Sequence, residues 1–301
     1  MATSLVVRSA DELRSELAAA RQRGLSVGFV PTMGALHAGH QALIERSAAG
    51  NGLTVVSVFV NPAQFEDPAD LASYPRSERA DVEMASEAGA GICFLPDAGE
   101  IYPPGHATSV SMRGAVTGVL EGAQRGPGHF DGVCTVLTVL FSLVRPDTAY
   151  FGAKDAQQVA VVRRLVRDLG LGLRIEAVPT VREHDGLAMS SRNARLGAAE
   201  RPAALALSRA LAEAGTAIVA GTVDSAAEVE ALGLAALERG GATPEYFAAV
   251  DPENFEPDEH PDGGTLLLCA ARVGDVRLID NMNAAEAAET GFGFDREREE
   301  S

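Results

Sequence analysis

Residues 26–49, SVGFVPTMGALHAGHQALIERSAA, predict a strand, a glycine-flanked turn and a helix in direct succession. The apolar run at 26–30 has the length of a buried strand, and apolar side chains recur at helical spacing from Gly39 onward. Between them lies PTMGALHAGH, whose glycines at 34 and 39 let the backbone approach a ligand closely. Free amides at the start of the helix favour an anion, so this turn is a candidate phosphate site.

The same alternation continues along the first part of the chain. Apolar runs predict strands at 54–60, 91–95 and 148–151, and helical spacing predicts helices at 10–23, 77–88 and 134–144. Alternating strands and helices indicate parallel βαβ units, so the predicted fold class is α/β with a Rossmann-like doubly wound parallel sheet. Ligands of such sheets bind beyond the carboxyl ends of the strands. The loops that leave the strands are therefore the candidate sites.

The second part of the chain has a different texture. Alanine-rich helices are predicted at 202–220 and 224–239, and strands at 246–250, 265–271 and 276–279. We therefore expect residues 1–184 to form the Rossmann-like domain and residues 185–290 a smaller C-terminal α+β lid domain. The last residues, 291–301, end in DREREES and are predicted to be an acidic, disordered tail.

The acidic composition argues against nucleic-acid and membrane partners. The chain has 42 acidic and 25 basic side chains and a net charge of −17, so its field repels nucleic acid and anionic membranes. An ATP site would need local cations and backbone amides to reverse that field. The 3 cysteines have no metal-ligand spacing, and no run approaches the roughly 20 apolar residues of a membrane span. We therefore expect a cytoplasmic protein with no nucleic-acid and no membrane partner.

Two histidines lie in the turn at 31–40, three residues apart. If they share one helical turn, the imidazoles of His37 and His40 can both donate hydrogen bonds to one polyphosphate. Two alternatives stay open at this point. The pair could be zinc ligands, although HExxH is absent and no third ligand is evident, or the pair could be purely structural.

Polar side chains follow two other predicted strands. Asn61 and Gln64 come after the strand at 54–60, in SVFVNPAQF, and their neutral amides can hold a hydroxyl and a carboxylate. The alternative for this segment is an ordinary turn. Lys154 comes after the strand at 148–151, in FGAKDAQQ. A lysine at a helix N-terminus opposes the macrodipole, so a bound anion would explain its position.

Two more segments offer cations. RGPGHFD, at 125–131, is predicted to be a loop that carries Arg125 and His129 beside an apolar helix. MSSRN, at 189–193, offers two hydroxyls and a guanidinium for phosphate oxygens, and Gly186 is a predicted hinge. A mobile linker with phosphate ligands would close over ATP and exclude water. The alternative is a helix N-cap followed by a solvated arginine.

In this order, the five segments resemble the pantothenate synthetase family of the HxGH nucleotidyltransferase superfamily. HAGH matches the HxGH signature, MSSRN is similar to the KMSKS loop, and VFVNPAQF, FGAKDAQQ and GLAMSSRN resemble motifs specific to the pantoate enzyme. The resemblance implies a homodimeric ligase that uses ATP and Mg²⁺. It also implies two steps: pantoate attacks ATP to give pantoyl adenylate and pyrophosphate, and β-alanine then displaces AMP to give pantothenate.

The resemblance further implies roles for individual residues. The expected catalytic residues, which bind phosphates, are His37, His40, Lys154, Ser190, Ser191 and Arg192. The expected nucleotide contacts are Met33, Gly39, Gly152, Asp155, Val181 and Met189, and Met33 is also expected to pack against pantoate. The expected pantoate site consists of Pro31, Phe59, Asn61, Gln64, Tyr74, Arg125, Val136, Leu137, Leu140 and Gln158. Asp81 is expected to assist Mg²⁺ or gating.

Three other functions fit parts of the pattern. One is an HxGH nucleotidyltransferase with a different acceptor, such as a phosphate monoester, which would need extra basic residues in place of Asn61 and Gln64. The second is a nucleotide-binding regulator that has lost its activity, although the polar motif residues needed for turnover are all present. The third is a zinc-dependent hydrolase that uses the histidine pair.

Overall fold

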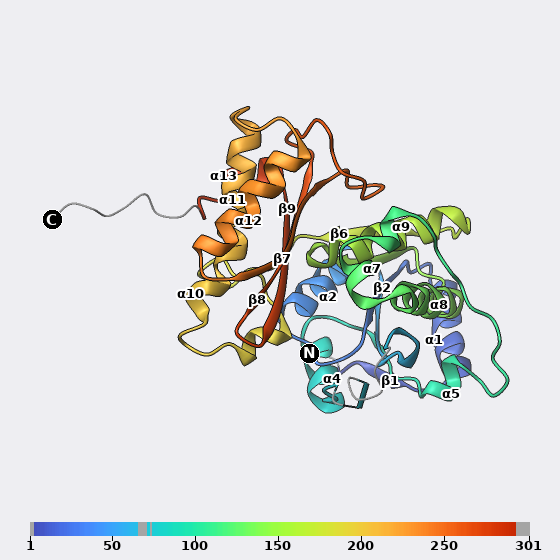
Figure 1. Cartoon of the computed structure of the whole chain (residues 1–301). Coiled ribbons are helices and arrows are strands. Elements are labelled where there is room, and N and C mark those ends of the chain that lie inside the picture. Colours follow the sequence, from blue (N-terminus) through green and yellow to red (C-terminus); the bar gives the residue numbers. More distant parts are fainter. Residues whose placement is uncertain (1–2, 66–70, 73, 293–301) are drawn as a thin grey trace. The chain divides into compact units, whose positions relative to one another are not determined.

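The computed structural model describes residues 3–65, 71–72 and 74–292. The chain divides into two compact units between Thr180 and Val181, close to the boundary predicted after residue 184 (Figure 1). Of the predicted tail at 291–301, residues 293–301 lie outside the described residues.

The first unit is built on a six-stranded sheet with the strand order β1-β4-β3-β2-β5-β6. Every strand pair in this sheet is parallel. The predicted Rossmann-like α/β fold is therefore confirmed. The strands are β1 (Leu5–Val7), β2 (Val27–Thr32), β3 (Leu53–Val58), β4 (Ile92–Phe94), β5 (Thr148–Gly152) and β6 (Arg174–Val178).

The two edge strands, β1 and β6, were not predicted. β1 has only 3 residues, too few for a periodic pattern. In β6, Arg174 and Glu176 alternate with Ile175 and Ala177, and most of the strand is half-buried or exposed. A strand at the edge of a sheet lacks the continuous apolar run that marks the central strands.

The order of the strands reverses next to β2. From β2 the chain adds β3 and then β4 on one side, whereas β5 and β6 lie on the other side. In a parallel sheet the carboxyl ends of neighbouring strands lie at the same edge, and ligands bind in the crevice at such a switch point. The segments that follow β2 and β5, which begin PTMGALHAGH and AKDAQQ, leave the sheet at this switch point.

Helices cover both faces of this sheet (Figure 1). Side chains alternate along a strand, so Phe29 and Val30 of β2 point to opposite faces. The Phe29 ring meets Phe141 edge-on, with 6.2 Å between ring centroids, whereas Val30 packs in one core cluster with Leu43. Phe141 belongs to α8 and Leu43 to α2. The helices are α1 (Ala10–Gln22), α2 (Ala38–Gly50), α4 (Glu78–Glu87), α5 (Ala98–Ile101), α6 (Ala115–Gly118), α7 (Glu121–Arg125), α8 (Pro127–Val144) and α9 (Ala156–Asp168), and the 3-10 turns are η1 (Pro62–Gln64) and η2 (Ala153–Asp155).

The prediction of a loop at 125–131 is wrong. Arg125 ends α7, and α8 begins at Pro127, so His129 lies in a helix. Only Gly126 interrupts the two helices, and its φ of 81° is in the left-handed region that favours glycine. Pro127 suits the first turn of a helix because that turn needs no amide donor. The sequence Gly-Pro-Gly at 126–128 is typical of a loop, so the positions of Gly126 and Pro127 that suit a helix boundary were not recognised.

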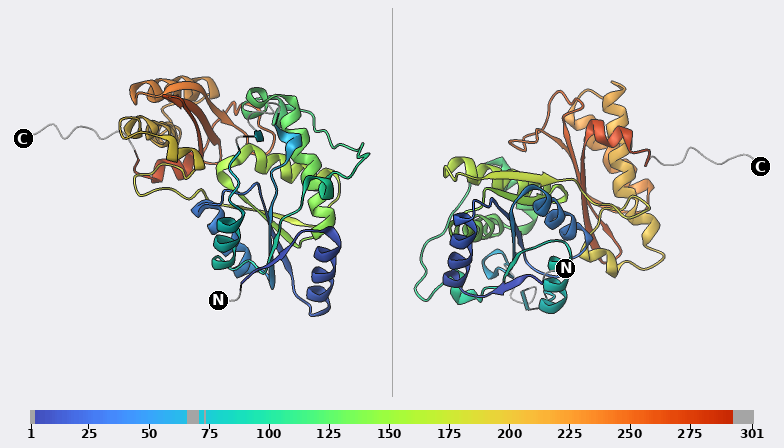
Figure 2. Two further views of the ribbon diagram at one scale, coloured as in Figure 1. Left: turned by 90° about the horizontal axis from the view of Figure 1, so that it is seen from below. Right: turned by 180° about the vertical axis from the view of Figure 1, so that it is seen from behind.

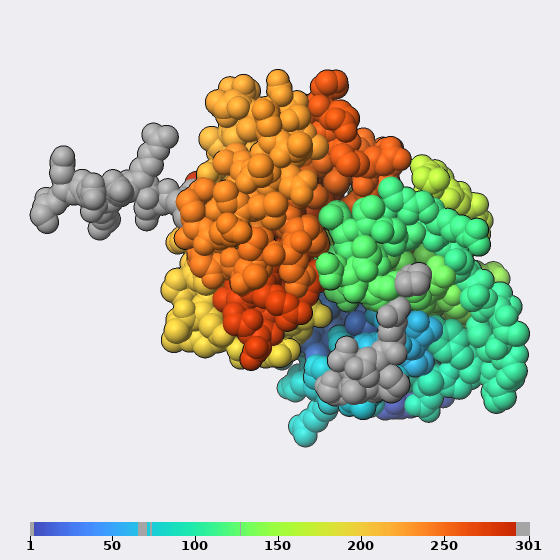
Figure 3. Space-filling model, viewed as in Figure 1, coloured from blue at the N-terminus to red at the C-terminus, as the bar shows by residue number. Residues whose placement is uncertain are grey.

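The second unit packs helices on one face of an antiparallel sheet with the order β7-β8-β9 (Figure 2). This unit is coloured from yellow to red in the space-filling view (Figure 3). The predicted helix at 202–220 is divided into α10 and α11 at Leu205. The elements are η3 (Ser191–Arg195), α10 (Arg201–Ala204), α11 (Ala206–Val219), α12 (Ala226–Arg239), β7 (Thr243–Val250), β8 (Leu266–Val273), β9 (Val276–Asn283) and α13 (Ala284–Glu289).

Within the described residues, no helix has both the length and the apolar character that a membrane crossing requires.

Candidate active site

His37 and His40 close the first turn of α2 with a reciprocal pair of hydrogen bonds. Nδ1 of His37 accepts from the amide of Gly39 at 3.1 Å, and Nδ1 of His40 accepts from the amide of His37 at 3.3 Å. The two ring centroids are 4.2 Å apart. A Cβ at position 39 would lie 2.8 Å from Cε1 of His37, so a side chain there would displace this ring. The histidine pair and its glycine therefore form one local unit.

These hydrogen bonds determine the tautomer of both rings. A backbone amide can only donate, so Nδ1 of each ring is unprotonated and the neutral ring carries its proton on Nε2. Burial lowers the pKa of His40 to about 4. Burial also lowers the pKa of His37, and the nearby Lys154 ammonium adds to that shift. Near neutral pH, each histidine offers an uncharged Nε2–H donor.

A buried carboxylate holds the turn before the histidines. Gly34 and Ala35 have φ values of 87° and 51°, which is an uncommon conformation for alanine. Asp81 of α4 is 2% exposed, and it accepts from the amides of Ala35 at 3.0 Å and Leu36 at 2.8 Å. Its carboxylate therefore stabilises the strained turn that leads into α2. The expected role of Asp81 at Mg²⁺ stays a prediction.

Lys154 and Asp155 lie in η2, between β5 and α9. The charge of Lys154 lowers the pKa of His37, and the charge of Asp155 opposes the lowering at both His37 and His40. The four groups are therefore within electrostatic reach of one another, as the switch-point topology requires. Lys154 is also the only lysine in the chain, so all other basic residues are arginines. The neighbouring predicted residues Gly152 and Gln158 are half-buried at the end of β5 and in the first turn of α9.

Asn61 lies just before η1, and its side chain bonds only to protein. It is 1% exposed, and its Nδ2 donates to Oε1 of Gln64 and to the Gly132 carbonyl, both at 3.1 Å. Its Oδ1 accepts from the amide of Ala63 at 3.2 Å and from the hydroxyl of Tyr102 at 2.7 Å. Every donor and acceptor position of this amide is used. This arrangement differs from the interpretation of the sequence, in which Asn61 itself binds the ligand.

Gln64 joins the end of η1 to the end of β2. Its Nε2 lies 2.8 Å from the sulfur of Met33, and its backbone carbonyl lies 3.1 Å from Nδ1 of His129. His129 is buried on α8. Burial lowers the pKa of His129, and the charge of Arg125 acts in the same direction. Three of the predicted segments thus meet around Gln64.

Helix α8 supplies an apolar face beside η1. A Cβ on Gly132 would lie 2.3 Å from the carbonyl oxygen of Ala63, so helix and turn are in direct contact. Val136 and Leu140 follow Gly132 at four-residue spacing and therefore share its face of the helix. Phe59, Val136, Leu137 and Leu140 are buried, Pro31 is half-buried, and Tyr74 is half-buried with its ring 5.7 Å from that of Phe65.

Gln157 was missed by the sequence interpretation, and it fixes the segment that carries Arg125. It is 3% exposed in α9. Its Oε1 accepts from the amide of Glu121 at 3.0 Å, and its Nε2 donates to the carbonyls of Val116 and Val119. Glu121 in turn accepts from Nε of Arg125 at 3.0 Å. No local pattern marks this role, because the partners are distant in sequence.

The remaining predicted residues belong to the second unit, where residues 181–189 form a tight antiparallel turn. The amide of Met189 donates to the carbonyl of Val181 at 2.9 Å. Arg182 binds both carboxylate oxygens of Asp280 on β9, at 2.8 and 3.0 Å. These two side chains are 14% and 2% exposed, and breaking such a buried pair is strongly destabilising. The turn is therefore firmly attached to the sheet of its own unit.

The structure does not support a hinge at Gly186. This residue is buried, its φ is 92°, and its amide donates to the carbonyl of Glu183 at 2.9 Å. A Cβ there would lie 2.9 Å from the ring of Phe292. Gly186 therefore allows a fixed tight turn.

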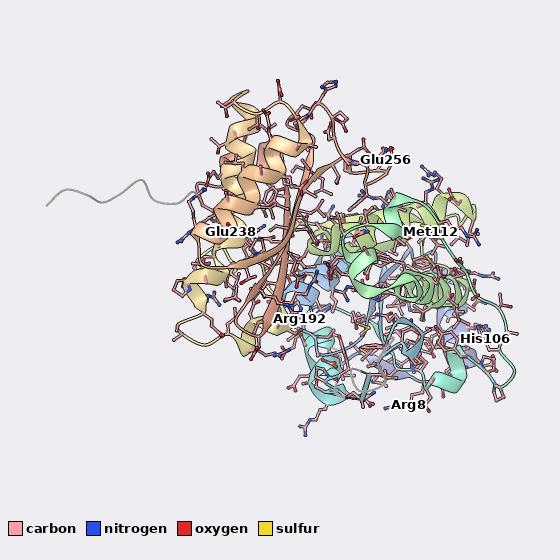
Figure 4. The ribbon with its side chains drawn as sticks, in the orientation of Figure 1. Arg8, His106, Met112, Arg192, Glu238 and Glu256 are labelled. Atoms are coloured by element: carbon pink, nitrogen blue, oxygen red, sulfur yellow. The ribbon has the colours of Figure 1, made fainter. Side chains whose placement is uncertain are left out.

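The predicted phosphate ligands follow this turn. The Ser190 hydroxyl accepts from the amide of Arg192 at 3.3 Å and caps η3, which is the alternative considered from the sequence. Ser191 and Arg192 are exposed, and Arg192 is labelled in Figure 4. Asn193 donates to the side chain of Glu183 at 2.7 Å. A cap and a ligand-binding loop are compatible, because capping uses the hydroxyl of only one of the two serines.

The sequence of the chain identifies its family. Residues 5–283 match the family described as "Pantoate-beta-alanine ligase". The chain belongs to this family. The resemblance found in the five motifs is therefore confirmed.

Individual proteins that are similar to the chain carry names of the same pantoate–β-alanine ligase family. A protein named "Pantothenate synthetase" from Rhizorhabdus wittichii is 50% identical over 278 residues, which cover 92% of this chain and 97% of that protein. A solved pantothenate synthetase from Thermus thermophilus is 45% identical with a TM-score of 0.85, and the match covers 93% of this chain and 99% of the other. The solved pantoate-beta-alanine ligase from Francisella tularensis, "Complexed with Beta-gamma ATP and Beta-alanine", is 29% identical with a TM-score of 0.74, covering 94% and 98%.

Proposed function

We propose that this chain is an ATP-dependent ligase that joins pantoate to β-alanine through a pantoyl adenylate. The observation that carries the proposal is the group formed by His37, His40 and Lys154 at the switch point of the sheet. In a chain of net charge −17, this group brings two neutral donors and the only lysine to the place where a parallel sheet binds its ligand. Family membership supports the same reaction.

In the first step, a carboxylate oxygen of pantoate attacks the α-phosphorus of ATP, and the bond from that phosphorus to the bridging oxygen breaks. Pyrophosphate leaves with the electron pair. The carboxylate is already ionised near pH 7, so this step needs no general base. Catalysis then depends on alignment and on stabilising charge at the phosphate oxygens. The Nε2–H groups of His37 and His40 and the ammonium of Lys154 provide that stabilisation.

Ser190, Ser191 and Arg192 are proposed to bind phosphate oxygens as well. The hydrogen bonds of Arg182 to Asp280 and of Asn193 to Glu183 hold the segment that carries them in its conformation. Gly152, Asp155, Val181 and Met189 are proposed to surround the nucleoside, together with Gly39 and Met33.

In the second step, the free amine of β-alanine attacks the carbonyl carbon of the adenylate, and AMP leaves as the amide forms. Gln64 is proposed to hold pantoate by hydrogen bonding, with Gln158 and the buried face of α8 on its other sides. Pro31, Phe59, Tyr74, Arg125, Val136, Leu137 and Leu140 complete the proposed acid site.

Mg²⁺ is the proposed metal, carried by ATP. Mg²⁺ keeps several waters and is commonly held by phosphate oxygens with one or two carboxylates. Among residues 3–65, 71–72 and 74–292, no group of three histidine, cysteine or acidic side chains could hold a metal by itself. That donor set fits an ion brought by the nucleotide. Asp81 is 2% exposed and its two oxygens already accept from the amides of Ala35 and Leu36, so its proposed part is to hold the turn near the ion and not to bind the ion directly. When bound, the ion would neutralise charge on the leaving pyrophosphate.

A cytoplasmic homodimer is proposed from the same family resemblance. The rival function is a transferase that acts on a phosphate monoester. The neutral Asn61–Gln64 pair argues against it, because a second phosphate would require cations at this position.

The product test is direct. Incubation with ATP, Mg²⁺, pantoate and β-alanine should yield pantothenate and AMP in equal amounts, measured by mass spectrometry. Formation of AMP without pantothenate, at saturating β-alanine, would count against the proposal.

A further inference from the structure

We infer that Tyr102 is a positioning residue for the acid substrate and acts on it through Asn61 and Gln64. Tyr102 follows α5, outside all five motifs, and nothing in the sequence pattern marks it. Its hydroxyl donates to Oδ1 of Asn61 at 2.7 Å. This inference rests on the proposed binding of pantoate by Gln64.

Backbone groups fix the direction of each hydrogen bond that links the side chains of Tyr102, Asn61 and Gln64. The amide of Ala63 can only donate and faces Oδ1 of Asn61, whereas the carbonyl of Gly132 can only accept and faces Nδ2. The second N–H of Asn61 must therefore donate to Gln64, whose facing atom is Oε1. Gln64 is left with its Nε2–H₂ group, of which one N–H lies against the Met33 sulfur and the other is left for a ligand. That group is a donor, which suits a carboxylate or hydroxyl oxygen and disfavours an ammonium group.

Tyr102 completes the coordination of Asn61. Oδ1 has two acceptor positions, and the amide of Ala63 fills one of them. Asn61 is 1% exposed, so water has little access to the second position, which the Tyr102 hydroxyl fills. Burial raises the pKa of Tyr102 to about 12, so the hydroxyl keeps its proton in the working range of the protein.

The ring of Tyr102 is itself held in place. Its centroid lies 6.3 Å from that of Phe59 and 5.1 Å from that of His106. His106 is exposed on the long segment after α5 and is labelled in Figure 4. The aromatic contacts would survive loss of the hydroxyl, so Tyr102→Phe removes one hydrogen bond and leaves the packing unchanged.

The test separates positioning from stability. Tyr102→Phe should raise the KM for pantoate about fivefold, the scale of one buried hydrogen bond, and leave the KM for ATP unchanged. Tyr150→Phe is the matched control, because Tyr150 is 2% exposed and its hydroxyl accepts from Asn51 at 2.8 Å, outside the proposed site. The control should change neither KM. Melting temperatures of both variants identify any general loss of stability.

A second variant tests the route through Gln64. In a Gln64→Ala background, Tyr102→Phe should have no further effect on kcat/KM for pantoate, because the residue on which it acts is gone. An unchanged KM for pantoate in Tyr102→Phe, an equal rise for both substrates, or the same fold loss in the Gln64→Ala background would each overturn the inference. Absence of pantoate-dependent activity in the unmodified protein would instead refute the proposed function.

Discussion

Asp81 accepts a hydrogen bond from the backbone amide of Leu36 at 2.8 Å, although 45 residues separate the two in the sequence. A second bond runs from the amide of Ala35, so one buried carboxylate holds two successive amides of the turn before the histidines. Asp81→Ala should leave both donors without a partner, and unsatisfied buried groups cost about 1–3 kcal/mol each. We expect a lower melting temperature together with a lower adenylation rate. Glu83→Ala, an exposed change on the same helix, is the control. Loss of stability with an unchanged rate would show that the turn does not position the histidines.

His40 should titrate far below an ordinary histidine, because burial lowers its pKa to about 4. In the unfolded chain the imidazole binds a proton at about pH 6.5. The unfolded state therefore binds more protons between these two values, and stability should fall as the pH drops from about 6.5 towards 4. NMR of the imidazole nitrogens measures the titration directly. His40→Gln should flatten the pH dependence of the melting temperature, and His260→Gln, a change on an exposed loop, should not. A midpoint near 6.5 for His40 in the folded protein would contradict the neutral-donor assignment.

Lys154 can be modified selectively, because it is the only lysine in the chain. An amine-selective acylating reagent should label only this side chain and the N-terminal amine. Labelling should lower the adenylation rate about 10²-fold or more, the scale for one preorganised donor, and bound ATP should slow the labelling. Mass spectrometry locates the label. The Lys154→Ala variant is the control, since the reagent should not reduce its residual rate further. Complete labelling at Lys154 with full activity would remove this residue from the catalytic group.

Gly132 sets the distance between α8 and the Gln64 turn. Gly132→Ala would place a Cβ 2.3 Å from the carbonyl oxygen of Ala63, so the turn must move. A shift of about 1 Å at a binding group can cost up to about 10²-fold, and we expect a higher KM for pantoate with little change for ATP. Gly172→Ala is the control, because a Cβ there meets no atom within 4 Å. An equal KM for pantoate in the Gly132→Ala and Gly172→Ala variants would contradict the proposed binding of pantoate by Gln64.

The sequence was sufficient for the central sheet and for placing the candidate motifs at one edge of it. Strands β2, β3, β4 and β5 contain the apolar runs that predict buried strands. Because these strands alternate with helices and run parallel, the segments after β2, β3 and β5 lie at one edge of the sheet. The prediction for residues 125–131 was wrong because their glycines and proline are typical of a loop. In the structure, only Gly126 departs from the helical conformation.

Supporting residues could not be predicted in the same way. Tyr102 lies 41 residues from its partner Asn61, and Gln157 lies 36 residues from Glu121. Such contacts depend on tertiary packing and leave no period or motif in the local sequence. Asn61 shows the converse: its motif was recognised, but its amide bonds to the protein on every side.

The most direct test of the central claim is the exchange of labelled pyrophosphate into ATP. With saturating ATP and Mg²⁺, the chain should catalyse exchange that requires pantoate and needs no β-alanine, since a carboxylate and ATP suffice to form the adenylate. Addition of β-alanine should then release AMP. The absence of exchange with pantoate under these conditions would contradict the proposed ligase.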